Sequence, residues 1–104
     1  MGREVSQVTR MLIKLNTIMR SFRERSNYPM LYVVDRVSGR HDVVVLIVDV
    51  VHQEREKAEE VVKRILEHLD SHNIKVVNYT LDSYLVPFRE VWRFVAMVSV
   101  NDSR

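Results

Sequence analysis

Apolar side chains recur at helical spacing through the first quarter of the chain. The steps between them alternate between three and four residues, a pattern that buries one seam of an α-helix. The seam consists of Val5, Val8, Leu12, Leu15, Met19 and Phe22, and Met11 and Ile18 widen it. Proline disfavours helical geometry in the residue before it, so Asn27-Tyr28-Pro29 should end the helix. The pattern predicts a helix over residues 4–25.

Two β-strands are expected after this helix. Residues 30–34 are apolar and rich in β-forming residue types. Residues 42–51 are apolar on both faces along their middle, as in strands that are covered on both sides. We therefore expect this second strand to lie at the centre of the sheet, covered by helices. The stretch between the strands is polar, and Gly39 can supply a positive φ for its turn.

Residues 53–69 carry the clearest helical pattern in the chain. Their apolar stripe consists of Ala58, Val61, Val62, Ile65, Leu66 and Leu69, and charged residues cover most other positions. Glu59 and Glu60 each precede a cation by four residues, the offset that stabilises an exposed helix face. Asn73 is a candidate left-handed residue at the helix end.

The last third of the chain predicts a strand and then a helix. Residues 74–80 have the composition of a third strand, and Pro87 suits the first position of a helix. Helical spacing then predicts a helix over residues 88–98, and leaves open whether residues 95–100 finish it or form a short edge strand. The repeating residues are Phe88, Val91, Trp92 and Val95. The expected fold is α/β (α+β), a single small layer in the order α-β-β-α-β-α with a mixed sheet, in one domain over residues 1–104.

Composition limits the function classes. The 104 residues include no cysteine, which excludes disulfide frameworks, thiolate zinc sites, iron–sulfur clusters and cysteine nucleophiles. The longest apolar run, residues 43–48, is far shorter than the roughly 20 residues of a membrane span. With no secretory signal pattern, we expect a cytoplasmic protein with no membrane partner. Gly2 and Gly39 are the only glycines, which excludes glycine-rich phosphate loops.

Charge is unevenly distributed, although the net charge is only +2. Residues 1–26 hold six Lys or Arg against two acids. The first helix therefore has a basic exterior, which binds nucleic-acid phosphates in a salt-dependent way or is an ordinary solvated surface. The candidate nucleic-acid contacts are Arg10, Lys14, Arg20, Arg23 and Arg25. No exposed aromatic residues interleave with them to stack on bases.

The connection between the first two strands gathers reactive residue types. These are Asp35, Arg36, Ser38, Gly39, Arg40, His41 and Asp42. Two nearby carboxylates can hold Mg²⁺, and adjacent arginines suit phosphate oxygens. The plain alternative is that a hairpin connection is polar because it faces water. Asp49 cannot share a metal with Asp42, because seven residues of regular strand place the two on opposite faces, roughly 23 Å apart.

One histidine pair has metal-ligand spacing. His68 and His72 lie four residues apart near a predicted helix end, where both imidazoles can reach one zinc ion. A zinc site needs about four ligands, and no third ligand is evident in the sequence. Histidine near a helix C-terminus is also favoured by the helix dipole. We therefore expect no metal site and no cofactor.

With the element order and the loop in hand, the chain resembles a minimal nucleotidyltransferase domain. That family runs helix, strand, Gly-Ser turn, strand with two alternating acids, helix, strand with a third acid, and a final helix. Residues 76–80 and 88–91 are similar to the family's last strand and the helix after it. The resemblance covers nearly the whole chain in element order and length.

The catalytic motif of that family is degenerate in this chain. Ser38-Gly39 stands near the place of the Gly-Ser turn, in reversed order, and Asp42 matches the first acid. Val44 takes the place of the second acid, and the third falls near Val76 or Asn78. Two-metal nucleotidyl transfer needs several carboxylates to hold its ions, so the resemblance implies a relative that has lost catalysis.

We therefore expect a non-catalytic nucleotidyltransferase-like binding or regulatory domain that acts through protein–protein contacts, with self-association as a homodimer. One alternative is a small nucleic-acid-binding protein that uses the basic N-terminal helix. A second is a metal-dependent nucleotidyl or phosphoryl transferase centred on residues 35–42, which alone would need Mg²⁺. Whether the chain is an enzyme stays open, and the missing acids favour a non-enzyme. The content of Val, Arg and Glu is also typical of proteins from heat-loving organisms.

Overall fold

In the residues that the structure describes, two α-helices and four β-strands follow one another in the order α-β-β-α-β-β. They are α1 (Gln7–Ser26), β1 (Met30–Arg36), β2 (Val43–Val51), α2 (Arg55–Ser71), β3 (Val76–Val86) and β4 (Arg89–Ser99). These bounds come from a computed structural model, which describes residues 6–51, 54–87 and 89–101. Over those residues the chain is a small α+β domain with two helices and a four-stranded sheet, in line with the predicted fold class.

The four strands form one sheet in the order β1-β2-β4-β3. Each pair of neighbouring strands is antiparallel, so the expectation of a mixed sheet is wrong. The reason is that β4 lies between β2 and β3, which run in the same direction and are connected by α2. If β4 came first in the sequence instead of last, the element order would be β-α-β-β-α-β, which is the order of ferredoxin-like domains.

The last element differs most from the sequence prediction. Residues 89–99 form strand β4, whereas helical spacing predicted a helix over residues 88–98. The predicted order α-β-β-α-β-α is therefore wrong at its final element, and the open question at residues 95–100 is resolved in favour of a strand through Ser99. Phe88, the first residue of the predicted helix, lies outside the described residues.

Packing explains why this segment is a strand. Trp92, Phe94, Ala96 and Val98 alternate along it, and all four are buried. In a strand these side chains share one face, whereas in a helix they would spread around the axis. β2 and β3 flank β4 on its two sides, so its backbone groups are paired on both edges.

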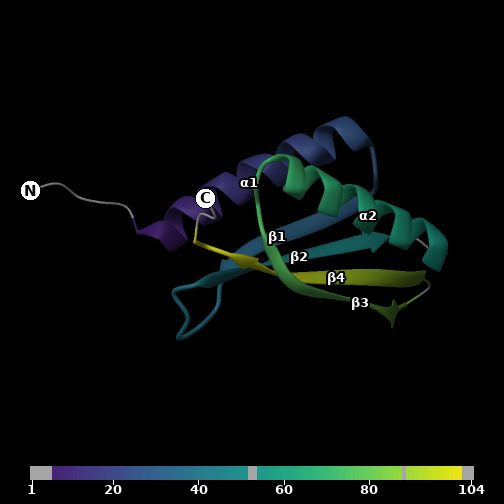
Figure 1. The fold of residues 1–104 in the computed structure, drawn as a ribbon. Helices are drawn as coiled ribbons and strands as arrows, with labels where there is room; N and C mark the ends of the chain where they lie inside the picture. Colours follow the sequence, from purple (N-terminus) through teal and green to yellow (C-terminus); the bar gives the residue numbers. More distant parts are fainter. Residues whose placement is uncertain (1–5, 52–53, 88, 102–104) are drawn as a thin grey trace, which may run out of the picture.

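Both helices lie on the same face of the sheet (Figure 1). The architecture is therefore two layers, a helix layer on a sheet layer, rather than the expected single layer. The core between them holds six residues of α1, five of α2 and eight of the two central strands. Helices cover β2 on one face only, whereas cover on both faces was predicted. The segment predicted as a third helix forms strand β4 instead, so it cannot cover the other face.

Local signals set the ends of the helices. Ser6 caps α1, since its Oγ accepts a hydrogen bond from the backbone N–H of Thr9 at 3.1 Å. Asn27 follows α1 with a left-handed backbone (φ 61°). Asn73 does the same after α2 (φ 60°), which confirms the sequence prediction. Neither helix in the described ranges has the length and apolarity needed to cross a membrane.

Candidate interaction surface

The sheet face without helices, which we call the open face, carries exposed apolar side chains. Strand residues alternate between the two faces, so the positions that do not enter the helix-side core point to the open face. Its apolar members include Leu31, Val33, Val45, Ile47, Val95 and Met97. Leu31 is 65% exposed and Val33 is 54% exposed. A contiguous apolar surface of this kind is typical of interaction sites, whereas scattered apolar residues are not.

The strand register arranges these residues in rows across the sheet. Val33 pairs with Ile47, and Ile47 pairs with Val95, which makes one apolar row. Val45 pairs with Met97 in the next row. Side chains directly opposite each other have Cβ atoms about 4.5–5.5 Å apart, so each row is continuous. These five residues form the apolar centre of the open face, which spans β1, β2 and β4.

A row of charged residues lies on one side of the apolar centre, and Asp35 on β1, the register partner of Val45, borders its other row. Asp49 on β2 pairs with Arg93 on β4, and Arg93 pairs with Asp82 on β3. We call these three residues the charged row. The sign of the charge alternates along the charged row. On β1, the residue beside Asp49 is the apolar Leu31.

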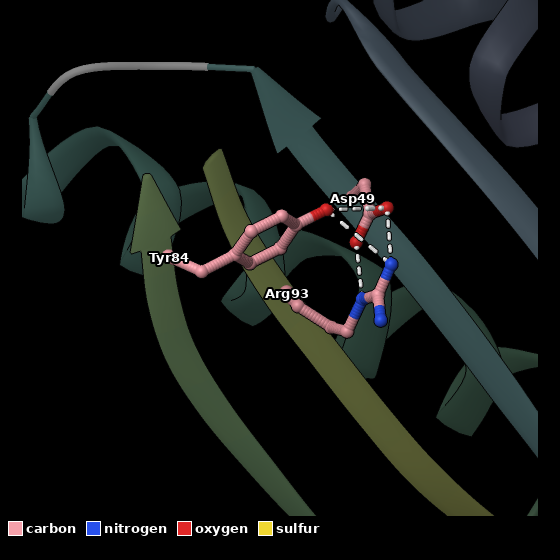
Figure 2. A network of polar contacts seen from close by, with 3 residues as sticks. All are labelled: Asp49, Tyr84 and Arg93. Atoms are coloured by element: carbon pink, nitrogen blue, oxygen red, sulfur yellow. Dashed lines mark hydrogen bonds and ion pairs between the residues drawn. The ribbon is translucent and has the colours of Figure 1, made fainter. Parts of the chain in front are cut away.

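Figure 2 shows that Asp49 and Arg93 meet Tyr84 on the open face. Arg93 donates from Nε to Asp49 Oδ1 at 2.8 Å and from Nη2 to Asp49 Oδ2 at 2.9 Å, which is a bidentate ion pair. The Tyr84 hydroxyl donates to Asp49 Oδ2 at 3.2 Å. The guanidinium also lies 5.1 Å from the centroid of the Tyr84 ring. Side chains of β2, β3 and β4 are thus tied together at one place.

The ion pair keeps both of its groups charged. The hydrogen bond from Arg93 holds the pKa of Asp49 below its ordinary value, although burial acts in the opposite direction. The hydrogen bond to Asp49 raises the pKa of Arg93. The Asp49 side chain is 19% exposed and the Arg93 side chain is 46% exposed. The arginine head therefore remains accessible to a molecule that approaches the open face.

The predicted loop cluster lies in the β1–β2 hairpin and divides into separate local contacts. Arg40 binds Asp42 in a bidentate pair at 2.8 and 2.9 Å, and this hydrogen bond lowers the pKa of Asp42. Asp35 accepts a hydrogen bond from the backbone N–H of Arg36 at 2.7 Å. The guanidinium of Arg36 donates to the Thr9 hydroxyl at 2.7 Å. The two carboxylates have different partners and do not form a common site.

The remaining loop residues shape an exposed turn. The backbone N–H of Arg40 donates to the carbonyl of Val37 at 3.0 Å, which places Ser38 and Gly39 at the centre of the turn. Gly39 has φ +76°, the positive value that the sequence predicts. His41 is exposed beside them. Within residues 6–51, 54–87 and 89–101, no group of three or more His, Asp or Glu is placed to hold a metal ion.

The histidine pair lies at the end of α2, with its ring centroids 4.6 Å apart. His72 Nδ1 is 3.0 Å from the backbone carbonyl oxygen of His68. His68 Nε2 is buried without a hydrogen-bond partner, and the His68 ring packs 5.3 Å from Phe22. Burial lowers the pKa of His68, and the nearby His72 and Arg25 act in the same direction. No third ligand completes a metal site in the described part of the chain.

The five predicted nucleic-acid contacts, Arg10, Lys14, Arg20, Arg23 and Arg25, are all exposed on α1. They lie on the helix layer and therefore on the opposite side of the sheet from the open face (Figure 1). Arg23 is partly engaged within the molecule, because its guanidinium lies 5.0 Å from the centroid of the Tyr32 ring. The structure thus contains two separate candidate surfaces, one apolar and one basic.

The open face is the feature that sequence reasoning missed. The sequence pattern predicts cover on both sides of residues 42–51, and its only conclusion about Asp49 is that it cannot share a metal with Asp42. A signal was nevertheless present, because Asp49 and Arg93 each interrupt a run of apolar residues. A charged residue inside an apolar strand indicates that one face of that strand meets either solvent or a partner charge.

Comparisons with known proteins identify no family for this chain. No protein-family model matches the chain, and no curated protein matches its sequence.

Proposed function

We propose that this chain is a non-catalytic interaction domain that acts through protein–protein contacts, and that a second copy of the chain occupies its open face. The observation that carries the proposal is the apolar centre, five side chains in two continuous rows with no covering element among the described residues. Removing such a surface from water contributes about 25 cal/mol per Å² of apolar area, from which the loss of translational and rotational freedom on association is subtracted.

The size of the open face supports a second copy as its occupant. Four strands about 4.8 Å apart and about nine residues long, at about 3.3 Å per residue, present roughly 570 Å² on one face. Two such faces would together bury a little over about 1,100 Å², near the lower limit of specific protein–protein interfaces. A matching face on a second copy has the size and shape needed to cover the apolar centre.

The geometry of the reactive residues supports a role without catalysis. The carboxylates of Asp35 and Asp42 have separate local partners. Asp49 is neutralised by Arg93. The nucleotidyltransferase resemblance stays a prediction, and the interaction proposal does not depend on it. A transferase at the loop would need further metal-binding acids, which the described residues do not supply.

The test is the oligomeric state of variants that place a charge on the open face. Val33→Lys adds a cation to the apolar centre at a position that is 54% exposed, so the folded monomer should tolerate it. Ile13→Lys is the matched control, because Ile13 is 62% exposed on α1, away from the sheet. Sedimentation equilibrium should show a dimer for the wild type and for Ile13→Lys, and a monomer for Val33→Lys. A monomeric wild type at high concentration would refute the proposal.

The basic surface of α1 favours a second candidate function, the binding of nucleic-acid backbones. Arg10, Lys14, Arg20 and Arg25 are exposed on one helix, and only Glu24 opposes them there. Such a surface should bind single- or double-stranded probes weakly, with an affinity that falls steeply as salt rises. Fluorescence anisotropy of wild type and Arg10→Glu/Lys14→Glu at low and moderate salt tests it. Equal binding by both proteins, or no binding at low salt, removes this candidate.

A further inference from the structure

We propose that two copies pack face to face about a two-fold axis that runs parallel to the strands, so that Arg93 of each copy meets the partner's Asp49. This inference rests on the proposed function, because it specifies how the open face binds its second copy. It adds a role for the charged row, which the burial of apolar surface alone does not explain.

Symmetry limits the choices. When two identical faces pack against each other as a dimer, the two-fold axis lies in the plane between them. For stacked sheets, that axis runs either across the strands or along them. The two choices bring different rows of the open face together, so the charged row distinguishes them.

An axis across the strands is unfavourable for the charged row. With such an axis at the middle of the apolar centre, the row of Asp49 and Arg93 would lie over the row of Val43 and Ser99. The charges would then lose water without gaining an opposite charge from the partner. Asp49 and Arg93 already pair within one chain, but removing an ion pair from water with no further opposite charge to contact is still costly.

An axis along the strands, between β2 and β4, makes the charged row complementary to itself. Each row of residues across the sheet then faces the same row of the second copy, with the order of the strands reversed. Asp49 faces the partner's Arg93, and Arg93 faces the partner's Asp49, so four charges of alternating sign meet. Stacked twisted sheets cross at about −30°, which shifts the facing rows sideways by about one strand spacing, a distance that the long Arg93 side chain can span.

The same axis also keeps the apolar rows together. Ile47 faces the partner's Val95, and Val45 faces the partner's Met97, so the side chains of both sheets can interdigitate in a layer about 10 Å thick. Tyr84 stays beside the ion pair, where its hydroxyl and ring already hold the guanidinium. At the two ends of the same row, Leu31 faces the partner's Asp82. Both residues lie at the rim of the interface, where water can still solvate the carboxylate.

Charge reversal in two separately purified variants tests this register. Asp49→Arg and Arg93→Asp each place like charges opposite one another in their own homodimers, so each should self-associate at least tenfold more weakly than the wild type. Mixed together, they should form a heterodimer with an affinity near that of the wild type. A tag on one variant and sedimentation velocity of the mixture would detect it.

A matched control comes from the other bidentate pair. Arg40 and Asp42 have the same Arg–Asp geometry, at 2.8 and 2.9 Å, but lie in the exposed hairpin loop. Arg40→Asp and Asp42→Arg should leave self-association unchanged. Because charge reversal at β2 or β4 could unfold the chain, circular dichroism must show native content for each variant. The neutral variants Asp49→Asn and Arg93→Gln provide a milder second test, and each should weaken the dimer.

The outcomes separate this inference from the proposed function. If the wild type is a dimer that Val33→Lys disrupts, but the mixed charge-reversal variants do not associate and the neutral variants dimerise normally, the open face is the interface and the register is wrong. Edge-to-edge pairing through β3 would give a dimer that Val33→Lys leaves intact. A monomeric wild type would overturn both proposals.

Discussion

At the scale of single residues, the fold changes the chemistry of Asp49 most. In an isolated strand this carboxylate would simply be solvated. In the sheet it accepts hydrogen bonds from Arg93 and Tyr84, which are 44 and 35 residues away in sequence. Its lowered pKa follows from contacts that exist only after β2, β3 and β4 have paired.

Asp49→Asn should lower the free energy of unfolding by about 1 kcal/mol at pH 7, because a charge-assisted contact is lost while solvent still reaches Arg93. The folded-state pKa of Asp49 lies below its ordinary value of 3.8. The contribution is therefore complete above that value and is lost as the pH falls through the folded-state pKa. Urea denaturation should show the two proteins converging below about pH 4. A constant difference between neutral and acidic pH would contradict this account.

Gly39 is the residue whose backbone is least replaceable. Its φ of +76° is unfavourable for L-residues, although nothing within 4 Å would touch an added Cβ. Gly39→Ala should therefore destabilise the chain by about 1 kcal/mol through backbone strain alone. Gly39→Asn should cost less, because asparagine tolerates this conformation. Thermal denaturation of both variants measures the two losses of stability. Equal losses for Gly39→Ala and Gly39→Asn would indicate that a steric contact of the added side chain, rather than the positive φ, causes them.

At the scale of elements, the sequence predicts the chain well until its last segment. Both helices and the first two strands form close to where their patterns place them. The third strand was predicted over residues 74–80, but β3 runs from Val76 to Val86, so the prediction ended it too early. Residues 91–98 satisfy two periods at once: Val91, Trp92 and Val95 fit a helix, and Trp92, Phe94 and Val98 fit one face of a strand. Pairing with β2 and β3 decides between them, and no local pattern contains that information. The many β-branched and aromatic residues favour a strand but do not by themselves decide between the two periods.

Two neighbouring substitutions test the strand at the C-terminal end. Phe94 is fully buried on the helix side, and Val95 lies on the open face. Phe94→Ala should cost about 3–5 kcal/mol because it leaves a cavity in the core. Val95→Ala should cost much less in the monomer, since its side chain is only partly covered. Chemical denaturation at low protein concentration measures both, and similar losses would argue against opposite faces.

At the scale of the whole molecule, the site depends on the layer arrangement. Sequence patterns found the basic surface of α1 and the polar hairpin, because both are local. The open face arises because both helices pack on the same side, and that follows from topology rather than from any single segment (Figure 1). Trp92 on β4 is buried in the core on the helix side of the sheet.

The melting temperature should depend on protein concentration. A dimer formed through the open face couples folding to association, so a higher concentration shifts the equilibrium towards the folded state. The wild type should melt several degrees higher when its concentration is raised a hundredfold, and Val33→Lys should show no such change. A wild-type melting temperature that is independent of concentration would contradict a folding-coupled dimer.

The central position of β4 also has a consequence for biosynthesis. The strand that joins the two halves of the sheet comes after the other three in the chain, so β2 and β3 lack their shared neighbour until residues 89–99 leave the ribosome. A nascent chain stalled before that point holds a β1–β2 hairpin with an unpaired edge, which is prone to aggregation. We therefore expect the cooperative folding of this domain to wait until β4 has left the ribosome.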